Sequence, residues 1–111
     1  MIRNAAFTVL VLFAALARAS TTGKVVGIVT DPDGEPLIGA SVVIEGTTFG
    51  SMTDAAGEYY IPMLDPGEYT VTARMVGMGP VSKEGVTVVA GQSTRIDFQL
   101  RHADNTYRWF E

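Results

Sequence analysis

The chain contains no cysteine, and only one of its 111 residues is a histidine, His102. A chain without cysteine has no disulfide to stabilise it and no cysteine to carry a lipid anchor after a signal sequence. It also lacks a thiol nucleophile, and one histidine is too few for a histidine-based zinc site. Because His102 lies in the C-terminal tail, beyond the last predicted strand, a Ser-His-Asp arrangement would depend on a chain end.

Basic residues are also scarce. Eight Lys and Arg residues face twelve Asp and Glu residues, which gives a formal net charge of −4. Nucleic acids and anionic membrane surfaces both require a basic patch on the protein that binds them. The charge balance therefore argues against both kinds of partner, and we expect that the protein does not bind nucleic acid.

Long apolar runs are absent except at the N-terminus, where Ala5–Ala17 is apolar apart from Thr8. This run is shorter than the roughly 20 residues that a helix needs to cross a bilayer. It follows the basic Arg3 and ends at Ala17-Arg18-Ala19, where small residues occupy the positions that a signal peptidase reads. We therefore predict a signal peptide over residues 1–19. An exported chain beginning at Ser20 would lose Arg3 and Arg18 and carry a net charge of −6.

After residue 20 no segment shows helical periodicity. Short runs rich in Val, Ile, Thr and Tyr alternate with Gly, Pro and Asp about every ten residues, a pattern typical of all-β sandwiches and barrels. The pattern predicts an all-β fold, a seven-stranded antiparallel sandwich of Greek-key type over residues 20–100, with 101–111 as a tail or truncated linker. The predicted strands lie near 24–30, 40–45, 50–53, 58–62, 68–75, 86–89 and 94–100.

Alternation of apolar and polar residues predicts which side chains face the core. The last strand shows it best, because Ile96, Phe98 and Leu100 alternate with polar residues. On the same argument, the other inward positions are Ala40, Val42, Ile44, Tyr59, Ile61, Tyr69, Val71 and Ala73.

The first strand is apolar on both faces, since Val25 and Val29 alternate with Val26 and Ile28. Such a strand is either covered on both sides or presents an apolar edge to a partner. If it is an edge, a lysine on its outer face, as in Val26→Lys or Ile28→Lys, should weaken partner binding. The other face would then be the one where a lysine, as in Val25→Lys or Val29→Lys, unfolds the domain.

The segment "TDAAGEYYIPMLDPGEYTV" (53–71) repeats Gly-Glu-Tyr, each time shortly after an aspartate. Asp54–Gly57 and Asp31–Gly34 have the Asp and Gly positions of type I turns, and Asp65-Pro66-Gly67 suits a type II turn with positive φ at Gly67. We interpret the repeat as turn signals, with each Glu outward and each Tyr inward. Paired catalytic carboxylates need a shared cleft, and the acids here lie in turns or on outward positions. The sequence therefore predicts no catalytic, cofactor-binding or metal-binding residues and no cofactor.

Exposed aromatic residues are the remaining candidates for ligand binding. A sugar-stacking platform could be built from Phe49 and Tyr60, or from Tyr107, Trp109 and Phe110 in the tail. The alternatives are that Tyr60 packs across strands and that the tail is a linker or docks on its own domain.

The ordered string "GIVTDPDGEPLIGASVVIEGTTFGSMTDAAGEYYIPMLDPGEYTVTARMVGM", completed by "VTVVAGQSTRIDFQL", resembles the carboxypeptidase regulatory-like domain. The resemblance covers about residues 24–100 and departs from the family pattern at Met78, where an aromatic residue is usual. It implies a transthyretin-like (prealbumin-like) β-sandwich. The matching positions are Gly27, Val29, Asp31, Gly34, Pro36, Leu37, Gly39, Ala40, Val42, Gly46, Thr47, Thr53, Asp54, Gly57, Tyr59, Ile61, Leu64, Pro66, Gly67 and Tyr69.

The resemblance implies a module without enzymatic activity. Similar domains lie behind the catalytic domain of some metallocarboxypeptidases and at the N-terminus of TonB-dependent outer-membrane receptors, between the signal peptide and the plug. We expect an exported module, periplasmic or associated with the outer membrane, that contacts a protein partner as a receptor's accessory domain or as a stand-alone relative. A carbohydrate-binding module of the carbohydrate-binding-like fold is the alternative, by analogy of fold alone.

Overall fold

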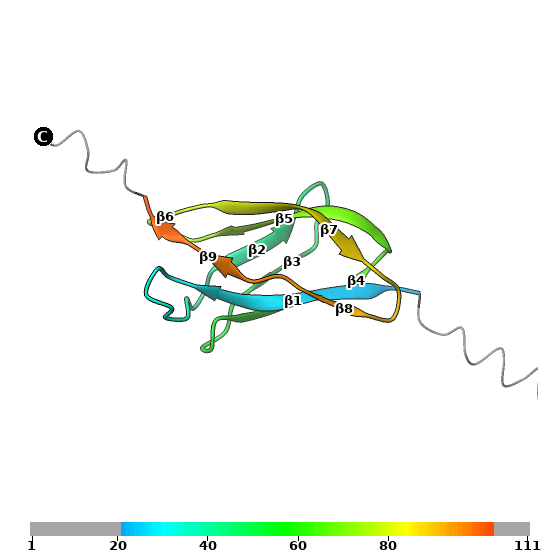
Figure 1. Cartoon of the computed structure of the whole chain (residues 1–111), viewed down its shortest axis with the longest axis horizontal. Helices are drawn as coiled ribbons and strands as arrows, with labels where there is room; N and C mark the ends of the chain where they lie inside the picture. The colour runs from blue at the N-terminus through cyan, green and yellow to red at the C-terminus, as the bar shows by residue number, and fades with distance from the viewer. Residues whose placement is uncertain (1–20, 104–111) are drawn as a thin grey trace, which may run out of the picture.

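The computed structural model describes residues 21–103, which form two β-sheets packed face to face (Figure 1). In the first sheet the order is β4 (Glu58–Leu64), β1 (Gly23–Thr30) and β8 (Ser93–Arg95), and β9 (Phe98–Gln99) also pairs with β1. In the second sheet the order is β3 (Gly50–Met52), β2 (Ser41–Ile44), β5 (Gly67–Arg74) and β7 (Val81–Val88). A small third sheet joins β6 (Met78–Gly79) to β10 (Arg101–His102). The predicted all-β sandwich is confirmed.

The last predicted strand is divided into β8 and β9, and both pair with β1 in parallel. The strand is interrupted at Ile96 and Asp97, because the backbone N–H of Ile28 donates to Oδ1 of Asp97 at 3.0 Å. A side-chain oxygen there takes the place of a backbone acceptor. Strands β6 and β10 lie outside the predicted set, and β10 falls in the segment that the sequence assigns to the tail.

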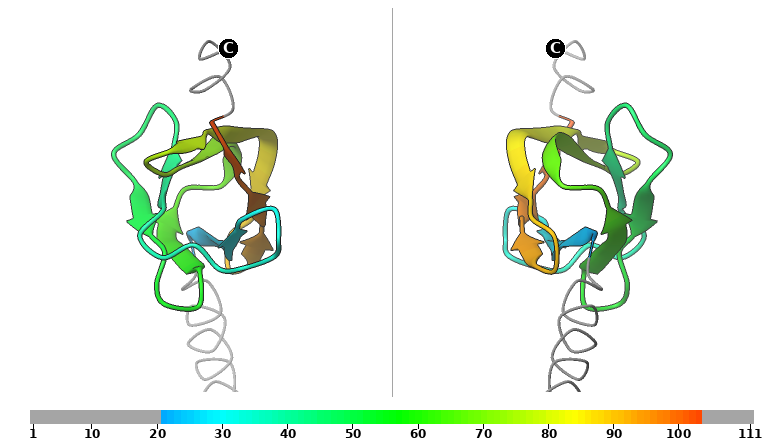
Figure 2. Two further views of the ribbon diagram at one scale, coloured as in Figure 1. Left: turned by 90° about the vertical axis from the view of Figure 1, so that its left-hand side faces the viewer. Right: turned by 90° about the vertical axis from the view of Figure 1, so that its right-hand side faces the viewer.

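The core lies between the two sheets, and the predicted alternation decides which side chains enter it. Along β1 the buried positions alternate with half-buried ones, and Val25 and Val29 are fully buried. Figure 2 shows the two layers end on, with β3 beside β4 on one side and β7 beside β8 on the other. The other buried apolar side chains are Ala40, Val42, Ile44, Tyr59, Ile61, Leu64, Val71, Ala73, Val86, Val88, Phe98 and Leu100.

Of the two alternatives that the sequence left open for β1, the free edge is excluded. The strand is hydrogen-bonded antiparallel to β4 on one side and parallel to β8 and β9 on the other. After β7 the chain turns at Val89–Gln92 and returns along β1, a long-range pairing that the composition of β1 does not reveal. Val26 and Ile28 do lie on the outer face, where each is half-buried.

The longest strand at a sheet edge is β7, and the structure protects it. A register shift opposite Tyr69 and Val71 breaks its pairing with β5, and Gly85 within β7 has φ +68°. The Lys83 ammonium donates to the Asp97 carbonyl at 2.6 Å and lies 5.4 Å from the centre of the Phe98 ring. Bulges and lysines are devices that discourage unwanted strand pairing, so we place the candidate site on a sheet face.

Candidate interaction surface

The repeated aspartates shape turns, as predicted. Oδ1 of Asp54 accepts the N–H groups of Ala56 and Glu58 at 3.0 and 2.9 Å, and the Gly57 N–H donates to the Asp54 carbonyl at 2.9 Å. Asp31 repeats this arrangement, because its Oδ1 accepts the N–H groups two and four residues later, both at 2.9 Å. Both carboxylates therefore hold exposed loops in place.

We expect Asp54→Ala to lower the free energy of unfolding by about 1–2 kcal/mol, because it leaves two backbone N–H groups without their acceptor. Asp54→Asn retains an acceptor oxygen and should recover most of the loss. Glu58→Gln and Glu68→Gln should stay within about 0.5 kcal/mol of wild type, since both side chains are exposed. Urea unfolding measures all four variants. A larger loss for either glutamine variant than for Asp54→Ala would contradict the turn interpretation.

The second Gly-Glu-Tyr differs from its prediction in one respect. Gly67 has φ +156° and begins β5, far from the roughly +80° of a type II turn. Met63 instead takes a left-handed conformation, with φ +64°, before the chain leaves β4. The Tyr69 hydroxyl donates to the Asp65 carbonyl at 2.7 Å and holds the connection closed. Glu68 is exposed and Tyr69 packs on the core, as predicted.

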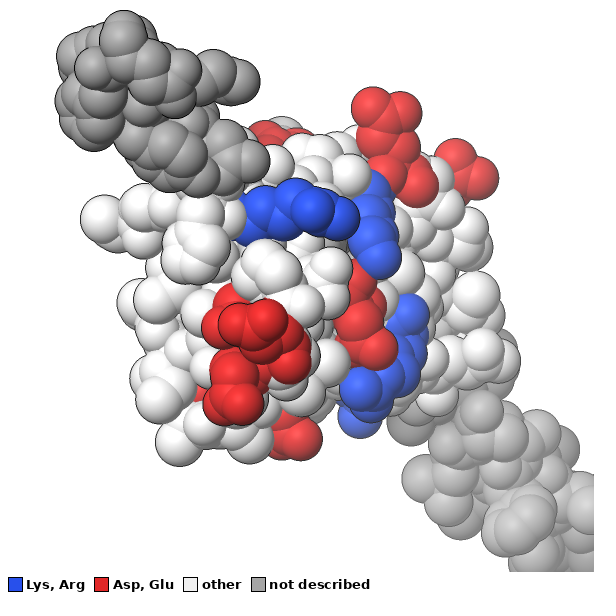
Figure 3. All heavy atoms as spheres, turned by 60° about the vertical axis from the view of Figure 1, so that its left-hand side comes forward, with Lys and Arg blue, Asp and Glu red and all other residues white. Residues whose placement is uncertain are grey.

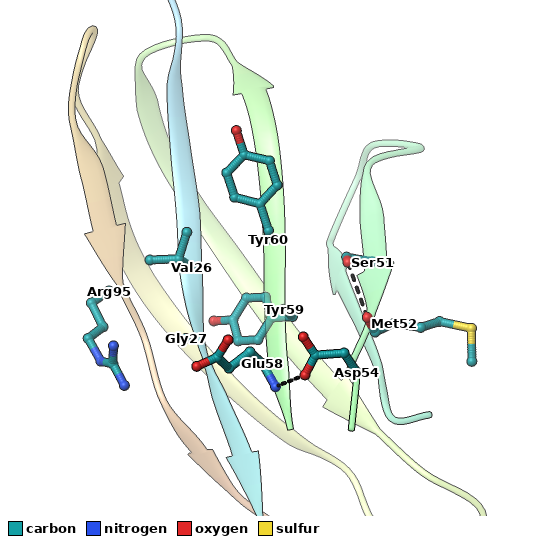
Figure 4. Close-up of a pocket in the computed structure, with 9 residues that line it drawn as sticks. All are labelled: Val26, Gly27, Ser51, Met52, Asp54, Glu58, Tyr59, Tyr60 and Arg95. Atoms are coloured by element: carbon teal, nitrogen blue, oxygen red, sulfur yellow. Dashed lines mark hydrogen bonds between the residues drawn. The ribbon is translucent and has the colours of Figure 1, made fainter. Parts of the chain in front are cut away.

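A groove of about 450 Å³ opens on the outer face of the first sheet, beside β3 (Figure 4). Three neighbouring strands contribute a row of side chains to it, because Val26 on β1 is paired with Tyr60 on β4 and with Arg95 on β8. The Tyr60 side chain is 52% exposed. Asp54 and Glu58 line one end of the groove. We call Tyr60, Val26 and Arg95 the outer-face row.

Charged side chains flank the outer-face row. The Lys24 ammonium lies 5.6 Å from the centre of the Tyr60 ring, and Arg95 pairs with Asp97 at 3.2 Å. In the view of Figure 3, basic side chains lie next to acidic ones and do not form one continuous basic surface. The face thus combines an aromatic ring, an aliphatic side chain and a guanidinium, with charges of both signs around them.

Tyr59 supports this face from the core side of the sheet. It is 3% exposed, its hydroxyl donates to the Ile96 carbonyl, and its ring lies 6.2 Å from that of Phe98. Burial raises the pKa of the Tyr59 phenol well above its ordinary value. The charge of Asp97 raises this pKa further, whereas Arg95 opposes the shift. The phenol therefore stays protonated at neutral pH and remains a donor to Ile96.

A second hollow of about 440 Å³ lies at the other end of β5, where the chain turns through Met75–Gly79. Its lining is mostly apolar, from Met75, Val76, Met78 and Pro80, with Arg74 at its margin. Val76 is 99% exposed. We call this hollow the methionine groove.

Among residues 21–103 the structure shows no cluster of three or more His, Cys, Asp or Glu side chains that could hold a metal ion. The same residues include no helix long and apolar enough to cross a membrane. His102 is exposed on β10.

The two described aromatic residues singled out from the sequence, Tyr60 and Phe49, do not line the same groove. Tyr60 lies in the outer-face groove, Phe49 is 43% exposed in the loop between β2 and β3, and the tail aromatics lie outside the described residues. Sequence reasoning considered Val26 only as a position on a strand edge and did not single out Arg95. The pairing of β1 with β4 and with β8 places both residues in one row with Tyr60.

Comparison with known proteins settles the family. The sequence profile of the carboxypeptidase regulatory-like domain matches residues 24–101. The chain belongs to this family. The matched profile describes a regulatory-like domain rather than a catalytic one. The resemblance recognised in the sequence is thereby confirmed.

Two relatives and one solved structure illustrate what this chain is similar to. It is 36% identical to carboxypeptidase D of Anas platyrhynchos over 68 residues, which are 61% of this chain and 5% of that protein. It is 54% identical to the TonB-dependent receptor SusC of Bacteroides thetaiotaomicron over 35 residues, 32% of this chain and 4% of the receptor. The chain thus spans only a small part of either relative. A cohesin–X-dockerin complex from Acetivibrio cellulolyticus shares the fold, with a TM-score of 0.64 at 21% identity over 74% of this chain and 59% of that one.

Proposed function

We propose that the domain is an exported, non-catalytic module that works by protein contact, as the accessory N-terminal domain of a TonB-dependent outer-membrane receptor or as a stand-alone relative. The similarity to part of SusC supports the receptor setting. A signal peptide over residues 1–19 is part of this proposal. We therefore expect the intact mass of the exported protein to correspond to a chain that begins near Ser20.

The outer-face row is the observation that carries the proposal. Tyrosine and arginine are enriched among the residues that dominate binding energy at protein interfaces, and such residues cluster near the desolvated centre of the interface. Here Tyr60 and Arg95 flank Val26 on a rigid three-stranded face beside an open groove. The sheet fixes the backbone of all three residues, so docking a partner orders little additional chain.

A carbohydrate-binding module is the second candidate, because Tyr60 is half exposed beside a groove that carboxylates also line. A sugar would stack on a free face of the ring. The Lys24 ammonium lies over the Tyr60 ring and competes for one such face. Protein contact therefore fits the surroundings of Tyr60 better than sugar stacking does.

Tyr60→Ala tests the proposal, with Phe49→Ala as the matched control, because Phe49 is also an exposed aromatic residue but lies away from the outer-face row. The probe is detergent-solubilised outer membrane of the source organism, passed over the immobilised domain. We expect Tyr60→Ala and Arg95→Ala to reduce capture of the retained protein at least about tenfold, the effect of losing a single contact worth 1.4 kcal/mol. Phe49→Ala should leave capture unchanged.

A polysaccharide column separates the two candidate functions. Protein contact predicts no retention of the wild-type domain on the column. Retention that disappears in Tyr60→Ala, together with unchanged protein capture, would reject the proposal in favour of carbohydrate binding.

A further inference from the structure

We propose that the methionine groove is the docking site for the chain's own C-terminal segment, residues 107–110, which would seat its aromatic side chains there. The groove is lined by flexible, apolar side chains, and Val76 on its rim is 99% exposed. Its volume of about 440 Å³ falls within the usual range of binding pockets, roughly 300–1,000 Å³.

The folded chain delivers this segment to the groove. Strand β10 runs antiparallel to β6, pairing Arg101 with Gly79 and His102 with Met78. The next residue, Ala103, donates its N–H to the Gly77 carbonyl at 3.2 Å. The chain therefore leaves the described structure at the turn that also carries Val76 and Met78. In Figure 1 the last described residues lie at the β6 end of the sandwich.

The segment that follows fits the groove in length and in chemistry. Tyr107 is four residues beyond Ala103 and Phe110 is seven, so fully extended chain would reach about 14 Å and 25 Å respectively. Three of the four residues 107–110 are aromatic, Tyr107, Trp109 and Phe110. Methionine sulfur makes favourable contacts with aromatic rings.

Because the segment is tethered close to the methionine groove, it is favoured over a separate partner as the occupant of the groove. A segment tethered a few residues from its site has an effective concentration on the order of millimolar, which a free partner rarely reaches. Arg74 at the margin of the groove adds a guanidinium that can lie over an aromatic face. Its present ion pair with Glu45 is 3.6 Å long, and both side chains are well exposed.

Trp109 is the only tryptophan in the chain, so its fluorescence reports directly on the segment. We expect the full chain to show blue-shifted tryptophan emission and reduced quenching by acrylamide. Val76→Asp should shift the emission to longer wavelength and increase quenching, because it places a charge on the rim of the groove. The fully exposed Val76 makes no packing contribution to the described fold, so this variant should stay folded and lose only the roughly 1.4 kcal/mol that corresponds to a tenfold preference for docking.

Met63→Asp is the control. Met63 is an exposed apolar residue away from the groove, and aspartate tolerates its left-handed backbone. Its emission should match wild type. Trypsin cleavage after Arg108 gives a second readout. It should accelerate about tenfold in Val76→Asp, as expected when a docked state that outnumbers the open one about ten to one is lost.

Three results would overturn the inference. The first is wild-type emission at the wavelength of free tryptophan. The second is an equal response to Val76→Asp and Met63→Asp. The third is protection that fades on dilution, which would mean that the groove is filled by the tail of a second copy.

Discussion

Gly27→Ala should remove more than about 3 kcal/mol of folding stability, at or beyond the upper end of the usual cost of overpacking. Gly27 faces the core in the central strand of the first sheet. A Cβ there would lie 1.8 Å from the Ile96 carbonyl oxygen and 2.9 Å from Cε2 of Tyr59. The nearer atom belongs to the backbone that links β8 to β9, so no rotamer change relieves the clash. Urea unfolding followed by circular dichroism measures the loss.

Gly34→Ala is the matched control, because it separates crowding from backbone strain. Gly34 has φ +85°, which strains any residue with a side chain, but no other atom lies within 4 Å of the position that its Cβ would occupy. It should cost about 1 kcal/mol. If Gly27→Ala were no less stable than Gly34→Ala, the Ile96–Asp97 segment would have to move away from residue 27 at little cost. That result would contradict the prediction that the close approach of Gly27 to the Ile96 carbonyl excludes a side chain.

The prediction from sequence succeeded where structure is decided locally. Period-two alternation correctly placed Val42, Ile44, Ile61 and Phe98 in the core. A strand with one solvent-exposed face has only one register that buries its apolar side chains. The aspartate turns were likewise predicted, because an Asp side chain finds its N–H partners within four residues.

The errors lie where distant segments meet. Both faces of β1 are apolar, and the sequence alone did not show that β8 and β9 would flank it. Gly67 was assigned to a type II turn, but the irregular backbone of this connection lies at Met63, a residue that rarely adopts positive φ. Glycine in a sequence suggests a position with positive φ, whereas a methionine gives no such indication.

The candidate site depends on the same distant pairings. Tyr60 could be chosen from the sequence because it alternates with the inward Tyr59. That Val26 and Arg95 are its neighbours could not be predicted, because the two residues are brought beside Tyr60 only by the pairing of three strands from distant parts of the sequence. The proposed site therefore consists of residues whose spacing along the chain does not reveal that they are neighbours.

Thr53 shows how a single buried hydroxyl fixes the loop that leads into the second sheet. The side chain is 5% exposed. Its Oγ1 donates to the Leu37 carbonyl at 2.5 Å and accepts the Ala40 N–H at 2.8 Å. The Thr53 backbone makes two further hydrogen bonds. Its N–H donates to the Ala40 carbonyl at 2.9 Å, and its carbonyl accepts the Gly39 N–H at 3.1 Å. One residue thus clamps segment 37–40 against the end of β3.

Thr53→Val should lower the free energy of unfolding by about 2–4 kcal/mol. Valine fills the same volume but leaves the Leu37 carbonyl and the Ala40 N–H without partners, and each such buried group costs about 1–3 kcal/mol. Thr53→Ser keeps the hydroxyl and removes one methyl group, a change of about 1 kcal/mol. In urea unfolding the serine variant should therefore be the more stable of the two. If valine were tolerated as well as serine, packing of the methyl group rather than the two hydrogen bonds would hold this loop, and the clamp assigned to Thr53 would be rejected.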